Sequence, residues 1–206
     1  MNKLPPAKRS QILHLLCEGN SIRAVTRLTG ASKNTVVKLL IDAGKACAEY
    51  QDRVFRDLSC KRVQVDEIWS FVYSKQKNVP EHKIGSAGDI WTWTAICADT
   101  KLVPSWLVGG RDGEFAKAFI DDLASRLKDR VQLTSDGHKA YLEAVEGAFG
   151  ADIDYAMLVK MYGMAPEGEK RYSPAVCTGA KKTKIAGNPD RDHISTSYSE
   201  RPRWET

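Results

Sequence analysis

The most β-prone segment of the chain carries two acidic residues in its middle. Residues 63–73 read VQVDEIWSFVY, and this density of β-branched and aromatic side chains is typical of a strand. A carboxylate inside a buried strand costs free energy unless another group pairs with it or neutralises it. Any fold of this chain must therefore contain a sheet with a place for Asp66 and Glu67, and we expect that place to be functional.

Alternation along this strand separates the two acids. Asp66 shares a face with Gln64 and Ser70, whereas Glu67 shares the opposite, more apolar face with Val65. Because its face is partly polar, Asp66 is predicted to line a cleft and to bind a metal ion. Glu67 is predicted to have a structural hydrogen-bonding role instead.

The segments that follow predict an α/β fold. Two more β-prone segments come next, with short turns between them, which indicates an antiparallel meander. Asp99 falls in one of these turns, and we expect it to have no role beyond the turn. After the first strand, the expected elements are strands at 90–98 and 102–108, a helix at about 113–128, a strand at 131–136, a helix at 139–149 and a strand at 153–160.

This order, followed by one more helix, is that of a ribonuclease-H-like domain with a mixed sheet. In such a sheet the fourth strand pairs with the first, so that Asp136, at the end of the fourth strand, comes close to Asp66. Two neighbouring carboxylates repel each other, and a hard divalent cation with oxygen ligands relieves that repulsion. The sequence therefore predicts a divalent metal site.

The charge of the chain is unevenly distributed. Residues 1–62 contain 12 Lys and Arg against 5 Asp and Glu, whereas residues 63–168 contain 11 against 16. A basic N-terminal part joined to an acidic middle part indicates a module that binds a polyanion, followed by a region that uses carboxylates.

The basic part has the pattern of a helix-turn-helix. Apolar residues recur at helical spacing in 6–17, in 22–29 and again after residue 31, with Ser21 as a cap and Gly30 in the turn. A small helical bundle whose charges face water would give the same pattern. The side chains expected to contact DNA are Arg23, Arg27, Lys33, Asn34, Thr35 and Lys38.

Three short blocks of the sequence together resemble the signature blocks of bacterial DDE transposases, most closely those of the insertion-sequence-one family. They are DEIW at 66–69, SDG at 135–137 and HISTSYSER at 193–201. The resemblance implies that Asp66, Asp136 and Glu200 bind Mg²⁺ or Mn²⁺ and catalyse DNA strand cleavage and strand transfer. It also implies double-stranded DNA as a partner, both element ends and target, and a homo-oligomer on that DNA.

The third block leads to further expectations at the C-terminus. If residues 196–200 are helical, His193 and Glu200 share a face, which predicts an assisting role for His193. Arg201 is predicted to contact a phosphate. Because Pro202 opposes continuation of a helix, we expect a C-terminal helix that is shortened relative to the family. Two alternatives stay open: a catalytically impaired relative that binds element ends without cutting, and a nuclease of the same fold.

We expect two domains, a helix-turn-helix domain with its linker at 1–60 and a ribonuclease-H-like catalytic domain at 61–206. The sheet tryptophans, Trp69, Trp91 and Trp93, are expected in the core. No apolar run reaches the roughly 18 residues of a membrane span, and the N-terminus lacks a secretory signal. The five cysteines contain no C-x-x-C and predict free thiols. We therefore expect no membrane association and a cytoplasmic, nucleoid-associated location in a bacterium.

Overall fold

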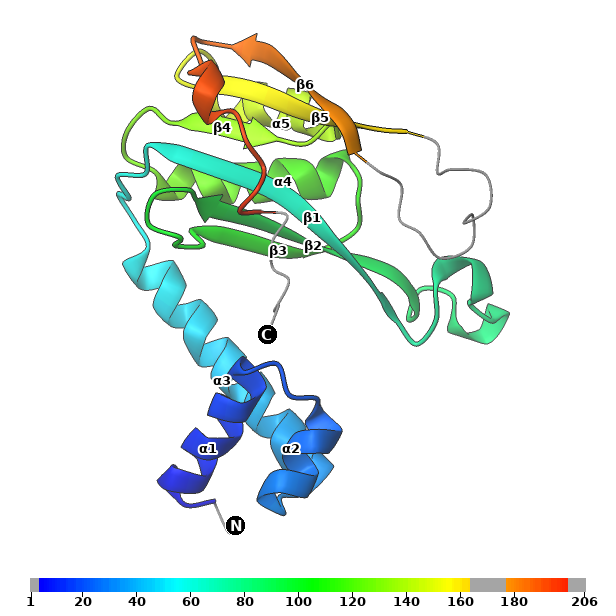
Figure 1. Ribbon diagram of the computed structural model, residues 1–206. Coiled ribbons are helices and arrows are strands. Elements are labelled where there is room, and N and C mark those ends of the chain that lie inside the picture. The colour runs from blue at the N-terminus through cyan, green and yellow to red at the C-terminus, as the bar shows by residue number, and fades with distance from the viewer. Residues whose placement is uncertain (1–3, 164–176, 200–206) are drawn as a thin grey trace. The chain divides into compact units, whose positions relative to one another are not determined.

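The chain divides into two compact units (Figure 1). The computed structural model describes residues 4–163 and 177–199. The first unit ends at Phe55, a few residues before the boundary expected at residue 60. Leu58 already belongs to the second unit, because its N–H donates a hydrogen bond to the carbonyl of Arg126 at 2.9 Å.

Three helices form the first unit. Its helices are α1 (Pro6–Cys17), α2 (Ile22–Thr29) and α3 (Lys33–Val54). Ser21 caps α2 by accepting the N–H of Ala24 at 3.2 Å, and Gly30 ends that helix with a left-handed φ of 68°. The inner faces bury Ile12 and Val25 in a small core. α3 runs without a break through the residues that the sequence assigned partly to a linker.

The second unit is built on a mixed sheet of six strands. Its strands are β1 (Arg62–Val72), β2 (Gly88–Cys97), β3 (Ser105–Gly109), β4 (Gln132–Ser135), β5 (Asp154–Tyr162) and β6 (Cys177–Ala186). They are ordered β3-β2-β1-β4-β5-β6 in space. β1, β2 and β3 form the predicted antiparallel meander, β4 is parallel to both β1 and β5, and β6 is antiparallel to β5.

Two helices, α4 (Gly113–Arg126) and α5 (Ala140–Phe149), cover one face of this sheet (Figure 1). Between sheet and helices lies the main hydrophobic core, in which Val65 and Trp93 of the sheet contact apolar residues of both helices. Because side chains alternate along a strand, the face of β1 that carries Val65 also carries Glu67, and the face opposite the helices carries Asp66.

The C-terminal segment crosses the sheet face that the helices leave uncovered (Figure 1). Ile194 is buried there in a small apolar cluster with two residues of β5. Nearer the end, the Gln64 side-chain oxygen accepts the backbone N–H groups of Tyr198 and Ser199 at 2.8 and 3.3 Å. The last described residues are therefore held against β1.

Several sequence expectations for the second unit were wrong. β6, a strand that the sequence analysis does not predict, follows β5, and its lysines suit the edge strand that it forms. β3 begins at Ser105 rather than at residue 102, because Pro104 has no N–H to give to the sheet. Residues 197–199 form a turn and not a helix. Trp93 is in the core as predicted, whereas Trp69 is exposed.

All five cysteines are free thiols, as predicted. Among the described residues, no helix combines the length and the apolar character that crossing a bilayer requires.

Candidate metal centre

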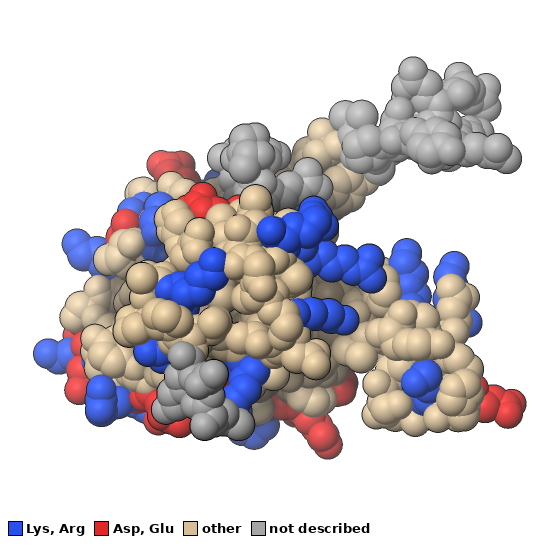
Figure 2. Space-filling view, turned by 90° about the horizontal axis from the view of Figure 1, so that it is seen from below, with Lys and Arg blue, Asp and Glu red and all other residues tan. Residues whose placement is uncertain are grey.

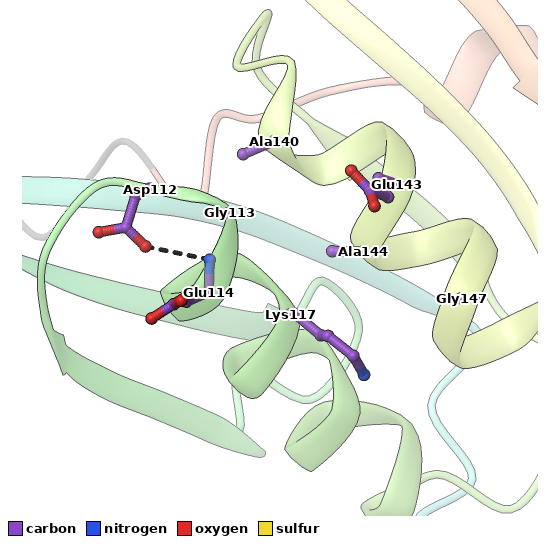
Figure 3. Close-up of a pocket in the computed structure, with 8 residues that line it drawn as sticks. All are labelled: Asp112, Gly113, Glu114, Lys117, Ala140, Glu143, Ala144 and Gly147. Atoms are coloured by element: carbon purple, nitrogen blue, oxygen red, sulfur yellow. Dashed lines mark hydrogen bonds between the residues drawn. The ribbon is translucent and has the colours of Figure 1, made fainter.

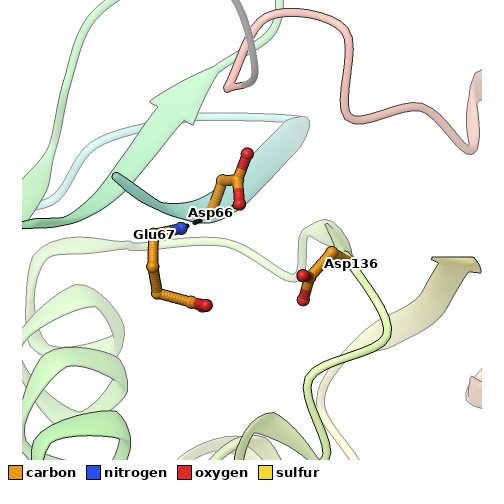
Figure 4. A group of neighbouring side chains, drawn as sticks. All are labelled: Asp66, Glu67 and Asp136. Carbon is orange, nitrogen blue, oxygen red and sulfur yellow. Dashed lines mark hydrogen bonds between the residues drawn. The ribbon is translucent and has the colours of Figure 1, made fainter. Parts of the chain in front are cut away.

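Three carboxylates meet where β4 ends beside β1 (Figure 4). Asp66 and Glu67 come from β1, and Asp136 directly follows β4. One oxygen of each residue lies within 4.8 Å of one oxygen of each of the other two. Two oxygens bound to one Mg²⁺ or Ca²⁺ ion at about 2.0–2.6 Å are at most about 4–5 Å apart, so these separations are close to those of ligands that share a cation.

The strand register explains why acids so far apart in the sequence meet. β1 and β4 run parallel, with Gln64 opposite Thr134. Asp66 lies two residues after Gln64, and Asp136 lies two residues after Thr134, so both lie further along in the same direction. Glu67 reaches the same place from the helix-covered face of β1, so that the cluster gathers side chains from both faces of one strand.

The Asp66 carboxyl group is partly buried and has an unusual pKa. Burial raises its pKa from 3.8 to about 6, a hydrogen bond from the Glu67 N–H at 2.8 Å opposes the rise, and the neighbouring charges of Asp136 and Glu67 add to it. An acid that resists ionisation in this way gains from a cation that stabilises its charged form.

This raised pKa predicts how stability depends on pH when no divalent cation is present. The folded chain keeps the Asp66 proton up to about pH 6, whereas the unfolded chain releases it near pH 3.8. The folded state thus binds more protons in this window, and the free energy of unfolding should fall as pH rises through it, by up to about 3 kcal/mol. Urea unfolding in EDTA, at several pH values between about 4 and 7, checks the slope.

Asp66→Asn is the informative variant for that experiment, because it removes the titrating group and keeps the shape of the side chain. It should lose most of the slope. An equal slope in the variant and the wild-type chain would assign the pH dependence to other groups.

Asp136 is held by the turn that follows β4. One of its carboxylate oxygens accepts the His138 N–H at 2.8 Å. Just before it, Ser135 is fully buried and shares a 2.7 Å hydrogen bond with the hydroxyl of Tyr155 in β5. These contacts fix the end of β4, so the second Asp136 oxygen is left facing the cluster and Arg111, whose guanidinium lies 3.9 Å away.

Glu67 is almost completely buried, with 1% of its side chain exposed. One carboxylate oxygen accepts a hydrogen bond from Arg111 Nε at 3.1 Å. The other oxygen makes no hydrogen bond that meets normal geometry, and the same is true of the nearby Tyr141 hydroxyl. Burial and the Glu67 charge raise the pKa of Tyr141 well above its usual value, so this hydroxyl stays protonated. Glu67 is thus held by Arg111 on one side and lies against the Tyr141 hydroxyl on the other.

Arg111 completes the site from the loop between β3 and α4. Its guanidinium lies 4.6 Å from the centre of the Trp91 ring, which fixes its direction. The loop packs closely at Gly109, where a Cβ atom would overlap the ring of Phe115. Arg111 could not be selected from the sequence, because an arginine after two glycines at a strand end has no distinguishing pattern.

Replacement of Arg111 by glutamine should destabilise the chain and strengthen its response to divalent cations. The variant leaves Glu67 buried without a positive partner, which we expect to lower the free energy of unfolding by about 1–3 kcal/mol. A divalent cation should then raise the unfolding temperature more than it does in the wild-type chain. Thermal unfolding with and without Mn²⁺ measures both effects, with exposed Arg191→Gln as the control. Equal Mn²⁺ stabilisation of Arg111→Gln and wild type would contradict this role of Arg111.

The structure brings some of the residues selected from the sequence together and not others. Asp66 and Asp136 meet, and Glu67, expected to be structural, joins them. His193 lies elsewhere: it pairs with Asp190 at 2.7 Å, next to Gln132 at the start of β4. At about 3.3 Å per residue, Gln132 is roughly 13 Å along the strand direction from Asp136. This geometry gives no support to an assisting role for His193.

Other sequence-selected residues lie outside the cluster. Glu200 and Arg201 fall outside the described residues. Asp99 lies in the turn after β2 and pairs with Arg62, as expected of a turn residue. The residues expected to contact DNA all belong to the three-helix unit, and five of the six are exposed there while Thr35 is partly buried: Arg23, Arg27, Lys33, Asn34, Thr35 and Lys38.

Two cavities lie away from the carboxylate cluster, and neither contains a comparable set of groups. One, of about 720 Å³, lies between α4 and α5 (Figure 3). Its Asp112 carboxylate is used to cap α4, where it accepts the N–H groups of Glu114 and Phe115. The other, of about 480 Å³, contains the ion pairs around Arg130 and His193. Asp112 in the first cavity, and Arg130 and His193 in the second, are therefore already used in contacts within the protein.

A scan against models of known protein families gave no match, and neither did a search of curated proteins.

Proposed function

We propose that the chain is a DDE-type DNA transposase that cleaves DNA strands at element ends and transfers them to target DNA. The observation that carries the proposal is the convergence of Asp66, Glu67 and Asp136 within 4.8 Å beside the junction of β1 and β4. The strand order β3-β2-β1-β4-β5 supports it, since it agrees with the ribonuclease-H-like arrangement that the sequence predicts.

The donor set fits Mg²⁺ or Mn²⁺. All three groups are carboxylates, which hard cations prefer, and the carboxylate of Glu67 is buried within the cluster. Asp66, Glu67 and Asp136 would hold the cation, and Glu200 is the further acid that the family resemblance implies. When bound, the cation would polarise the scissile phosphate and lower the pKa of the attacking hydroxyl group.

The remaining groups of the site have roles in positioning. The side chain of Arg111 is 39% exposed, so it can donate hydrogen bonds to a phosphate oxygen while it stays paired with Glu67. Its contact with Trp91 limits the directions in which it can point. A phosphodiester at the cluster would thus meet a fixed positive charge on the side of the β3–α4 loop.

The three-helix unit supplies the proposed recognition of double-stranded DNA. α2 and α3 are joined by a short turn at Gly30, as in a helix-turn-helix, and the first turn of α3 exposes Lys33 and Asn34. Lys38, one turn further, is paired with Asp42 at 2.8 Å, so its contact with a phosphate would have to replace that pair. We propose that the N-terminal end of α3 enters the major groove.

One experiment separates the proposed transposase from the two alternatives. Duplexes that the full chain selects from a random-sequence library are tested as donors for strand transfer into plasmid DNA, with Mg²⁺ or with EDTA. Metal-dependent joined products support a transposase. Metal-dependent nicks without joining would identify a nuclease of the same fold, and binding without either product would identify a DNA-binding relative that does not cut.

A further inference from the structure

The strand that carries the carboxylates continues into an exposed, two-stranded arm. We define the arm as residues 68–88, the part of β1, β2 and their connection that extends beyond the rest of the sheet (Figure 1). From Ile68 to Ala87 no residue is buried. The arm therefore has no core of its own, and backbone pairing between its strands continues to Val72 and Gly88.

Large aromatic side chains cover one face of this arm in spite of the missing core. Trp69, Phe71 and Tyr73 follow each other at every second residue and are 39, 47 and 66% exposed. Trp69 and Phe71 lie on the same face of β1 as Glu67, by alternation, and Tyr73 follows directly after the strand. The centres of the Trp69 and Phe71 rings are 5.7 Å apart, so the rings form a continuous apolar row. Exposed apolar patches of this kind mark interaction sites.

The row leads directly away from the carboxylate cluster. Trp69 is only two residues from Glu67, about 7 Å along the strand. Across the sheet it pairs with Trp91, the same ring on which the Arg111 guanidinium rests. Glu67, Arg111, Trp91, Trp69 and Phe71 thus form one line of neighbouring side chains from the cluster to the arm.

The charge of the arm is positive. It contains Lys75, Lys77 and Lys83 against Glu81, while Asp89, opposite Phe71 in β2, accepts the backbone N–H of Gln76. Two of the lysines lie over the rings: the Lys75 ammonium is 5.1 Å from the centre of Trp69, and that of Lys83 is 4.6 Å from the centre of Tyr73. Figure 2 shows the arm as the projection at the right, with basic side chains along it and an acidic one at its outer edge.

We propose that this arm binds single-stranded DNA next to the carboxylate cluster, with unpaired bases stacked on the aromatic row and phosphates paired with the lysines. Exposed rings interleaved with basic side chains are what sequence-tolerant binding of unpaired nucleotides requires. A second copy of the chain fits less well, because a symmetric contact between two arms would bring like charges together. The inference rests on the proposed function for the origin of the strand: it is the strand freed at the cleavage site.

The test measures binding of a short fluorescein-labelled oligothymidylate to the full chain by fluorescence anisotropy, in EDTA and with excess unlabelled duplex. The duplex occupies the three-helix unit, and EDTA prevents cleavage, so the result does not depend on the proposed catalysis. Phe71→Ala and Tyr73→Ala should each weaken binding by about tenfold or more, which is the usual loss of affinity when one base loses its aromatic stacking partner. Both residues are exposed, so the variants are expected to fold.

Two further variants separate base stacking from general apolar contact. Phe71→Tyr keeps a ring and should bind like the wild-type chain, whereas Phe71→Leu should bind as weakly as Phe71→Ala. Trp106→Ala, at a tryptophan on β3 that is 46% exposed, is the matched control and should have no effect. Unchanged affinity in Phe71→Ala, or full affinity in Phe71→Leu, overturns the proposal. So does a loss of self-association in Phe71→Ala with oligothymidylate binding unchanged, which would identify the arm as a contact between subunits.

The same assay distinguishes failure of this inference from failure of the proposed function. Asp66→Asn should abolish strand transfer but leave oligothymidylate binding intact. If the wild-type chain transfers no strands and Phe71→Ala still loses oligothymidylate affinity, the arm binds unpaired DNA in a protein with another activity.

Discussion

Asp66→Asn and Asp136→Asn are each expected to reduce metal-dependent strand transfer by at least about a hundredfold, a loss typical of removing one group that stabilises transition-state charge. Each substitution replaces a charged oxygen donor with a neutral amide that binds a hard cation poorly. Duplex binding by the three-helix unit should remain unchanged, because that unit contains neither residue. Strand-transfer and duplex-binding assays on the same preparations measure the two effects.

Asp121→Asn is the matched control for these variants. It makes the same chemical change on α4, at a partly exposed residue whose pair with Lys117 is an ordinary helix-surface contact. Its strand transfer should equal that of the wild-type chain. If Asp66→Asn and Asp136→Asn keep the activity of this control, the carboxylate cluster is not the catalytic site and the proposed function is wrong.

Trp93→Ala should produce the largest loss of stability, about 3–5 kcal/mol in the free energy of unfolding. The Trp93 side chain is completely buried and contacts the rings of Phe119, His138 and Tyr141. Its indole N–H donates to the Gly110 carbonyl at 2.9 Å, a hydrogen bond that alanine also removes. The cavity would lie next to the cluster, because Trp93 in β2 is the direct partner of Glu67 in β1.

Urea unfolding of Trp93→Ala, Trp93→Phe and the exposed Trp106→Ala measures this contribution. Trp93→Phe keeps most of the buried area and should lose less than Trp93→Ala. Trp106→Ala should lose the least, because its ring is partly in solvent. A Trp93→Ala chain as stable as Trp106→Ala would show that the core can close around the missing ring. Because Gly110 precedes Arg111, we also expect Trp93→Ala to make the position of the Arg111 side chain less well defined.

Part of the candidate site could be predicted from the sequence, because it depends on strand order. A β-rich segment with a central acid, and a later strand ending in another acid, were sufficient to predict that Asp66 and Asp136 meet. Glu67 was assigned a structural role because alternation places it on the opposite face of β1. That placement is correct, but a side chain of its length at the end of the β1–β4 pairing still reaches the same cluster.

Other features depend on contacts that no local pattern reveals. β6 is a strand because β5 offers it a partner, although its lysine-rich sequence does not favour one. The exposure of Trp69 follows from the length of the β1–β2 hairpin beyond the covered sheet, and sequence hydrophobicity alone favours burial. Arg111 belongs to the site because it lies beside Glu67 and Trp91. Only the packing of the β3–α4 loop determines that position.

Because the cluster uses both faces of β1, its arrangement depends on the register of that strand. A change of one residue in the alignment of β1 with its neighbours would send every side chain to the other face. Asp66 would then point towards the helices and Glu67 away from them, and Val65 would exchange its buried place for an exposed one. The chain would keep its full number of acids but lose their arrangement. Single-residue insertions and deletions in β1 should therefore be much less tolerated than those in the connection at the tip of its hairpin.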